Sequence, residues 1–347
     1  MTDFRARFWL NVLIALVGLA AFALVPAVFN RGIVFLAGLV AINVVFALSW
    51  NLLFAGIGLL SFGHAMFFAG GAYMVAVLSL NVPAMPFLLM LLAGALTGGA
   101  IAFIFGVVAL RRASGTYFAI LTLAFAELVH IVITKTNFLG RNDGLVGIRR
   151  PVIDLGVVEI NLATGNAYYY FLIAAMTVAA FALWCLQNSA AGRLMQAIRQ
   201  DPARAAFLGA DVQSWKLIAF VISGCFAGFS GAVLAPWVQI VSPEIAHWTL
   251  STQPILFSLL GGTGSFWGPA LGAILFGMMD YGTRNLQGLA DLTIGVLLLA
   301  VVLAIPGGIT GLVSQAFRRR RSDAARTGKV AAGGIGAGRT GEGEKVS

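Results

Sequence analysis

Long apolar stretches separated by short polar ones dominate the chain. A helix rises about 1.5 Å per residue, so about 20 apolar residues cross the roughly 30 Å hydrocarbon core of a bilayer. Ten stretches approach this pattern and predict an all-α polytopic membrane protein. They are Phe8–Phe29, Ile33–Phe54, Ser61–Leu80, Pro86–Leu110, Tyr117–Ile133, Tyr168–Leu186, Lys216–Trp237, Thr249–Leu260, Trp267–Tyr281 and Leu286–Ile305. The eighth and ninth are short for complete spans, which leaves broken or re-entrant helices as the alternative there.

The composition excludes a water-soluble protein. Of the 347 residues, 60% are apolar and 10% are charged, whereas a soluble domain carries about 25% charged residues. This excludes a cytosolic enzyme, a nucleic-acid binder and a secreted disulfide scaffold. The two cysteines, Cys185 and Cys225, lie in apolar stretches and have no metal-binding spacing, so we expect neither a metal nor a cofactor.

The basic residues predict the orientation. The first stretch is too long for a signal-peptide core and has no convincing cleavage site, so we expect it to be retained. Ten spans put both termini on one side of the membrane. Twelve Lys and Arg residues fall on that side and six on the other, which predicts cytoplasmic termini by the positive-inside rule. Four of the six opposing charges lie within Lys135–Arg150.

Three segments are polar and long enough to lie outside the membrane. Two belong to the predicted membrane domain, residues 1–317, and the third is the tail that follows it. Thr136–Ala167 is expected to be an external loop. Residues 188–215 are expected to be cytoplasmic and helical, and Pro202 makes two short helices as good an interpretation as one. The apolar positions that recur at helical spacing there are Leu194, Ile198, Ala205 and Leu208. The tail 318–347 begins with four arginines and becomes Gly/Ala-rich, which predicts a disordered cytoplasmic end near anionic headgroups.

Forty-two glycines allow close helix packing, as in the four-residue spacing of Gly268 and Gly272. The run Gly261-Gly262-Thr263-Gly264-Ser265 is different, because consecutive glycines are poor helix formers. Two interpretations stay open for it. It is a tight cytoplasmic loop, or a broken helix that lines a transport pathway.

Few ionisable residues lie inside the predicted spans, where such residues are costly and often functional. His64 starts the third span, and either an inter-helix hydrogen bond or a pathway role explains it. Glu127 and His130 are three residues apart on the fifth span, so they share a helix face and can bond each other. A satisfied pair and a pathway role are the alternatives for these two.

Catalytic and nucleotide-binding motifs are missing. The sequence contains no HExxH, GxSxG or CxxC, and no GxxxxGK[ST] phosphate-binding loop. We therefore expect no enzymatic activity in this chain, and any ATP dependence must come from another polypeptide.

Several ordered motifs resemble one known family. Residues 60–73 read LSFGHAMFFAGGAY, residues 115–127 read GTYFAILTLAFAE and residues 261–269 read GGTGSFWGP. Shorter matches are NDGL at 142–145, the segment from Gly192-Arg193 to Gly209, VSPE at 241–244 and PGG at 306–308. Together, over roughly residues 40–312, they resemble the permease subunits of branched-chain amino-acid ABC transporters, and most closely their M-type half.

The resemblance implies the ABC importer permease fold and a membrane subunit that moves branched-chain, hydrophobic amino acids inward across a bacterial inner membrane. It implies a second permease subunit, two cytoplasmic ATPases and an external, periplasmic substrate-binding protein as partners, with no nucleic acid. The predicted ATPase-coupling residues are Gly192, Arg193, Arg199, Asp201, Ala205 and Gly209. The family often has Glu-Ala-Ala-x-x-x-Gly here. This chain has Ala203-Arg204-Ala205 before Gly209, with no Glu at the first position, and Asp201, two residues earlier, is the candidate substitute.

The same resemblance, together with the ionisable residues, gives two further sets of candidates. The predicted substrate-pathway residues are Ser61, Gly63, His64, Tyr117, Thr122, Glu127, Gly262 and Thr263. The residues predicted to face the binding protein are Asn142, Asp143, Gly144 and Glu244.

Three rival functions stay open. The first keeps the fold and imports urea or short-chain amides. The second is a proton-coupled secondary transporter that uses Glu127 and His130. The third, an intramembrane enzyme with His64 as base, has neither a nucleophile nor a second acid beside it.

Overall fold

The computed structural model describes residues 17–113, 115–154, 159–283, 292–293, 295–296, 299–300 and 308–311. Residues 8–16 of the predicted first span lie outside this part. So do most of the predicted last span, Leu286–Ile305, and the predicted tail 318–347.

Six of the described helices are long and apolar enough to cross a membrane. They are α2 (Arg31–Asn51) with its continuation η1 (Leu52–Ile57), α3 (His64–Asn81), α4 (Phe87–Arg112), α5 (Thr116–Lys135), α6 (Ala167–Asn188) and α9 (Val212–Val238). Their ends lie within a few residues of the predicted ones, because polar residues and prolines flank the apolar stretches. The apolar helix Val17–Val28 is shorter, as are α10 (Trp248–Gly261) and α11 (Gly268–Thr283).

One feature of the long helices was not predicted. The last six residues of the second span, Leu52–Ile57, form a π-helix, and Gly58 ends it with a left-handed backbone at φ 81°. π-Helical turns are rare and occur frequently at functional sites.

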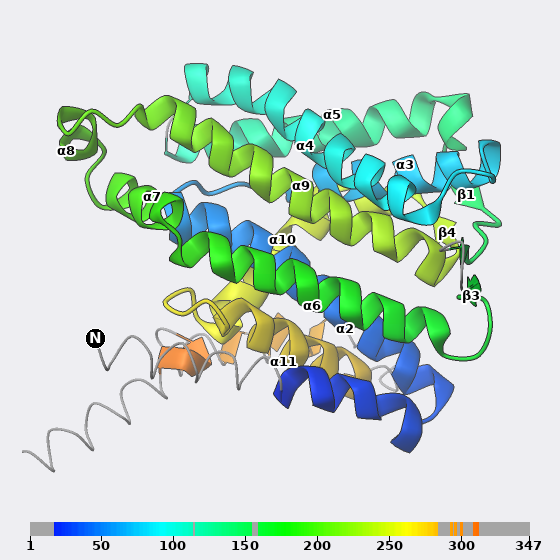
Figure 1. The fold of residues 1–347 in the computed structure, drawn as a ribbon. Helices are drawn as coiled ribbons and strands as arrows, with labels where there is room; N and C mark the ends of the chain where they lie inside the picture. The colour runs from blue at the N-terminus through cyan, green and yellow to red at the C-terminus, as the bar shows by residue number, and fades with distance from the viewer. Residues whose placement is uncertain are drawn as a thin grey trace, which may run out of the picture.

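The segment 188–215 contains two helices, α7 (Ala190–Gln200) and α8 (Pro202–Phe207). Pro202 is the first residue of α8, where a missing N–H costs nothing, and Asp201 caps that helix through a bond to the Arg204 amide. Of the two interpretations open from the sequence, the two-helix one is confirmed. Figure 1 shows α8 projecting beyond one end of the bundle, which we call the α8 end.

The described residues of the segment Thr136–Ala167 lie at the opposite end, which we call the strand end. It contains η2 (Asn137–Leu139), β1 (Leu145–Val146), β2 (Val152–Asp154) and β3 (Glu159–Asn161). β2 and β3 pair with each other, and β1 pairs antiparallel with β4 (Ile240–Val241), which follows α9. The short helix η3 (Pro243–Ala246) then leads to α10.

Helix α9 runs through the bundle between α3 and α4 on one side and α2 and α6 on the other (Figure 1). Glycines allow the backbones to approach: a Cβ on Gly71 would overlap the Gly228 carbonyl, and one on Gly98 would overlap the Gly224 carbonyl. The packing interpretation of Gly268 and Gly272 is confirmed in the same way, since added Cβ atoms would overlap the carbonyls of Gly262 and Phe257. Close approach of small residues is a main source of helix association in lipid.

Candidate functional site

Six polar residues from different segments of the chain lie inside the bundle, and each side chain is fully buried. They come from α2, the segment before α3, α3 itself, α5, α9 and α10. We call them the buried polar cluster: Ser49, Ser61, His64, Thr122, Ser223 and Ser251. Buried polar groups at this depth are costly unless they bond each other, so the cluster fixes how these helices meet.

His64 is the centre of the cluster. Its Nε2 lies 3.2 Å from Ser49 Oγ and 3.1 Å from Ser223 Oγ. Both hydroxyl hydrogens are already used, because Ser49 donates to the Phe46 carbonyl and Ser223 to the Ser49 carbonyl. Nε2 must therefore carry the hydrogen and donate to the two oxygens. Nδ1 is buried and has no hydrogen-bond partner among the described residues, and in a neutral ring with its hydrogen on Nε2 it is an acceptor.

The backbone before α3 is held by side chains of other helices. Trp50 Nε1 donates to the Ser61 carbonyl at 2.9 Å, and Thr122 Oγ1 accepts from the Phe62 amide at 3.1 Å. Ser251 Oγ accepts from the Ala65 amide at 2.8 Å, which satisfies one of the free N–H groups at the start of α3. Irregular backbone is tolerated inside a membrane protein where such partners replace water.

The predicted pathway residues separate into two groups. The structure brings Ser61, Gly63, His64 and Thr122 together, and a Cβ on Gly63 would overlap the Thr122 carbonyl. Tyr117 lies apart from them, with 76% of its surface exposed at the start of α5. Glu127, Gly262 and Thr263 lie at other places.

Gly262 and Thr263 form the turn between α10 and α11. Gly262 has φ 98°, which favours glycine, and a Cβ on Gly261 would overlap the Gly268 carbonyl. The turn is also tied to the described residues near the C-terminus, because Thr310 Oγ1 donates to the Gly261 carbonyl at 2.8 Å. The glycine run is therefore a tight turn between two short helices.

Glu127 and His130 do not pair with each other as the sequence suggested. Glu127 Oε2 lies 3.9 Å from Nε2 of His247, and His130 Nδ1 lies 3.1 Å from the Pro243 carbonyl. The rings of His130 and His247 meet edge to face, with centroids 5.2 Å apart. We call His130 and His247, together with the neighbouring Glu127, the histidine pair. The reason for the difference is that η3 and the start of α10 pack on this face of α5 and supply nearer partners.

The predicted coupling residues occupy different positions in α7 and α8. Gly192 and Ala205 are buried, and a Cβ on Gly192 would overlap the Gln187 carbonyl. Arg193 bonds the nearby Asn188 carbonyl at 3.0 Å. Asp201 forms an exposed ion pair with Arg204 at 3.5 Å.

Arg199 and Gly209 complete that set. Arg199 donates to the Ala55 carbonyl of η1 at 2.7 Å. Gly209 has φ 89° and open space around it, so it makes the left-handed turn between α8 and α9. At the start of α9, hydrogen bonds from the Ser214 side chain and backbone hold the pKa of the Asp211 carboxyl below its ordinary value.

Two large apolar residues at the tip of this element were missed. Phe207 is 93% exposed and Leu208 is 84% exposed. Leu208 shares the apolar spacing of the segment, but α8 ends at Phe207, so Leu208 follows the helix and stays exposed. Two apolar residues before a glycine in a polar segment were the available signal.

At the strand end the residues predicted to face a binding protein lie close together. Asn142 and Asp143 are exposed, and Gly144 packs so closely on β4 that a Cβ would overlap the Val241 carbonyl. Glu244 is exposed in η3, three residues after β4.

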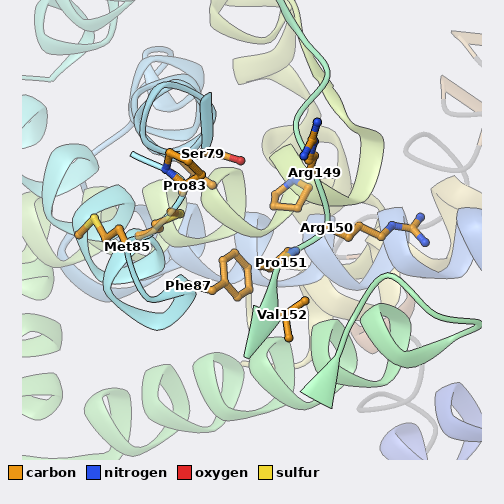
Figure 2. A pocket seen from close by; sticks show the side chains of 11 residues that line it. Ser79, Pro83, Met85, Phe87, Arg149, Arg150, Pro151 and Val152 are labelled. Carbon is orange, nitrogen blue, oxygen red and sulfur yellow. The ribbon is translucent and has the colours of Figure 1, made fainter. Parts of the chain in front are cut away.

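Beside this surface lies a cavity of about 270 Å³. Figure 2 shows Pro83, Met85 and Phe87 on one side of it and the segment Arg149–Val152 on the other. The Arg150 guanidinium lies 5.3 Å from the ring centre of Trp237, a distance at which cation and ring attract.

No group of three or more His, Cys, Asp or Glu residues within the described ranges is arranged to hold a metal ion. The cysteines Cys185 and Cys225 are unpaired.

Comparison with known proteins gives consistent matches. The family model for the branched-chain amino acid transport system permease component matches residues 32–305. The high-affinity branched-chain amino acid transport system permease protein LivM of Escherichia coli (strain K12) is 30% identical over 304 residues, covering 82% of this chain and 71% of the relative. LivM of Salmonella typhimurium is 28% identical over 321 residues, covering 86% and 75%.

A more distant similarity covers part of the chain. The fructose import permease protein FrcC of Rhizobium meliloti is 25% identical over 162 residues, covering 44% of this chain and 45% of the relative. No solved structure matches the chain.

Proposed function

The chain belongs to the family of branched-chain amino acid transport permeases, and on that premise we propose that it imports branched-chain, hydrophobic amino acids with energy from ATP hydrolysed on separate subunits. Family membership makes it a multi-pass membrane protein and the permease component of an ABC transporter, not an enzyme. The substrate, the direction of transport and the partners are the proposed part.

The observation that carries the proposal is the helical pair α7–α8. It lies outside the long apolar helices and exposes Phe207 and Leu208 at its tip. Large exposed apolar side chains mark surfaces that a partner covers. We infer that this tip enters a groove on one of the two ATPases, with α7 as the packed base, since Met195 and Ile198 of α7 are fully buried.

Charge distribution supports the proposed orientation. The basic residues of α7 and α8 and the last turn of α4, with Arg111 and Arg112, belong to segments expected on the cytoplasmic side. We therefore propose a bacterial inner-membrane location with both termini in the cytoplasm. The strand end then faces outward, where Asn142, Asp143 and Glu244 are exposed to a binding protein.

The proposed mechanism is alternating access in a complex with a second permease and two ATPases. Nucleotide must bind two permease states differently, because a partner with equal affinity for both shifts nothing. The buried polar cluster is the region that such a change must rearrange, since it joins α2, α3, α5, α9 and α10 through hydrogen bonds. The unpartnered Nδ1 of His64 is an acceptor available to a donor in one of the states.

Reconstituted transport tests this proposal. The chain is assembled in proteoliposomes with candidate ATPases, a second permease and a binding protein from the same genome, and uptake of labelled leucine and urea is compared. ATP-dependent leucine uptake is the expected result. Uptake of urea alone would support the amide-importer alternative, and leucine uptake that a protonophore stops and ATP depletion spares would support the secondary transporter.

A double variant tests the docking surface. Phe207→Ala with Leu208→Ala should reduce ATPase association about a hundredfold or more, by loss of about 1.5–3 kcal/mol per apolar anchor. Leu96→Ala, which removes an exposed apolar side chain from α4, is the matched control and should leave association unchanged. Normal association of the double variant would reject these residues as the contact.

A further inference from the structure

Arg199 joins α7 to the π-helical end of α2. Its guanidinium donates to the Ala55 carbonyl at 2.7 Å and lies 5.9 Å from the ring centre of Phe54. Both contacts are with η1, which is 144 residues away along the sequence. The bond is charge-assisted and therefore stronger than one between neutral groups.

The acceptor is a carbonyl at a helix end. Gly58 turns left-handed and stops η1, so the last carbonyls have no following turn of helix to bond them. A cation near the C-terminal end of a helix also interacts favourably with its dipole. Arg199 thus caps a helix to which it does not belong.

The Arg199 side chain packs closely on Gly58, which leaves little room for α7 to move relative to η1. A Cβ on Gly58 would lie 3.2 Å from Arg199 Cγ and 3.8 Å from Arg199 Cβ. Met195 and Ile198, on the buried face of the same helix, are fully buried in the core. Figure 1 shows α7 lying against the α8 end of α2.

The π-helix leads directly to the buried polar cluster. Six residues separate Ile57 from His64, the first residue of α3. Within them, Ser61 is bonded by Trp50 and Phe62 by Thr122. The segment that joins η1 to α3 is therefore short, and its residues near α3 are bonded to other helices. A displacement of Ala55 is passed along this segment to the start of α3.

We propose that Arg199 is a positioning residue that makes α7 and the π-helix move as one unit, so that a force applied at α8 reaches the buried polar cluster. The inference rests on the proposed function, since the force is that of a docked ATPase. This proposal also assigns a role to the π-helix. A π-helical turn has one extra residue in each hydrogen-bonded ring, and here it connects α2 to the segment before α3 and can change conformation between them.

The first test uses the full reconstituted complex and measures the ratio of solute uptake to ATP hydrolysis. Arg199→Ala should lower this ratio about tenfold, the effect of losing one charge-assisted bond, while the complex still assembles and hydrolyses ATP. Arg199→Lys keeps the donor and charge and should recover part of the ratio. Arg112→Ala removes the same charge from an exposed position in the last turn of α4, outside α7 and α8, so its ratio should stay within about twofold of wild type.

A merely structural role gives a different result. It would lower the amount of assembled complex and leave the ratio per complex unchanged, which would overturn the proposal. Leucine uptake by the wild-type complex is measured in parallel and tests the proposed function. A wild-type complex that imports leucine beside an Arg199→Ala complex with a normal ratio would reject this inference alone.

A second test replaces the Arg199 contact by a covalent bond. The Cβ separation of 3.8 Å at Gly58 and Arg199 lies within the roughly 3.5–4.5 Å range of disulfides. Gly58→Cys with Arg199→Cys, in a background with Cys185→Ala and Cys225→Ala, should be uncoupled when reduced and regain coupling when oxidised. Gly58→Cys alone is the control for backbone strain.

The opposite pattern would overturn the proposal. If the oxidised protein is inactive and reduction restores transport, α7 and the π-helix must separate during the cycle. If oxidised and reduced proteins are equally coupled, the contact has no part in transmission.

Discussion

The buried polar cluster and the histidine pair use the same kinds of side chain in different surroundings. His64 is fully buried, and its Nε2 lies 3.1–3.2 Å from hydroxyls on two other helices. The side chains of His247 and Glu127 are 29% and 39% exposed, and His247 Nε2 lies 3.9 Å from Glu127 Oε2. The first site is a dense hydrogen-bonded junction, and the second is a loose contact near the strand end.

The difference in burial determines how much stability is lost when one side chain of each site is replaced. In a buried site every donor and acceptor must be matched, so removing one partner leaves an uncompensated group. In a partly exposed site, water replaces a lost partner at little cost. We therefore expect substitutions in the cluster to change stability strongly and those in the histidine pair to change it weakly.

The largest effect is expected for Gly63→Ala. The backbone at Gly63, with φ −107°, accepts alanine, but the new Cβ would overlap the Thr122 carbonyl, which cannot rotate away. We expect a loss of about 3 kcal/mol and a lower thermal midpoint of the purified protein in nanodiscs. Gly264→Ala, with open space around it, is the control. Equal midpoints for the two variants would mean that the junction is not tightly packed.

A smaller effect is expected for Thr122→Val. Valine keeps the shape but leaves the Phe62 amide without its acceptor, which should cost about 1–3 kcal/mol. Thr122→Ser keeps the hydroxyl and should remain nearer to wild type. The comparison is made by thermal unfolding, and a serine variant weaker than the valine variant would show that the methyl group, not the hydrogen bond, stabilises the junction.

The smallest effect is expected for Glu127→Gln in the histidine pair. The contact with His247 is long, at 3.9 Å, and the Glu127 side chain as a whole is 39% exposed, so its loss should change stability by less than about 1 kcal/mol. Glu244→Gln, an exposed neighbour in η3, is the control for general charge effects. If Glu127→Gln lowers stability as much as Thr122→Val does, the histidine pair and the buried polar cluster do not differ in their contribution to stability.

Local patterns predicted the helices well. The ends of α4 were readable because Pro86 precedes it and Arg111 and Arg112 close it, and Pro202 marked the division of α7 from α8. The π-helix was not readable, because the sequence of Leu52–Ile57 continues the apolar pattern of α2 and the change in hydrogen bonding leaves no mark in periodicity.

The candidate site was predictable in its members but not in its partners. The sequence singled out Ser61, His64 and Thr122, but Ser223 lies 159 residues from His64 and Ser251 lies 186 residues from Ala65. His247 was not considered as a partner of Glu127, and the exposure of Leu208 was not predicted. Each of these depends on which helices pack together.

The sequence by itself determined that the chain is a bundle of apolar helices in a membrane, because hydropathy and length act on each segment independently of the others. It also carried the family motifs across most of the chain. The tertiary structure alone decided that Arg199 caps the end of α2, that His64 bonds two serines on other helices and that Phe207 is left in the open. Those contacts join segments far apart in the chain, and they exist because glycine-mediated packing sets which helix faces meet.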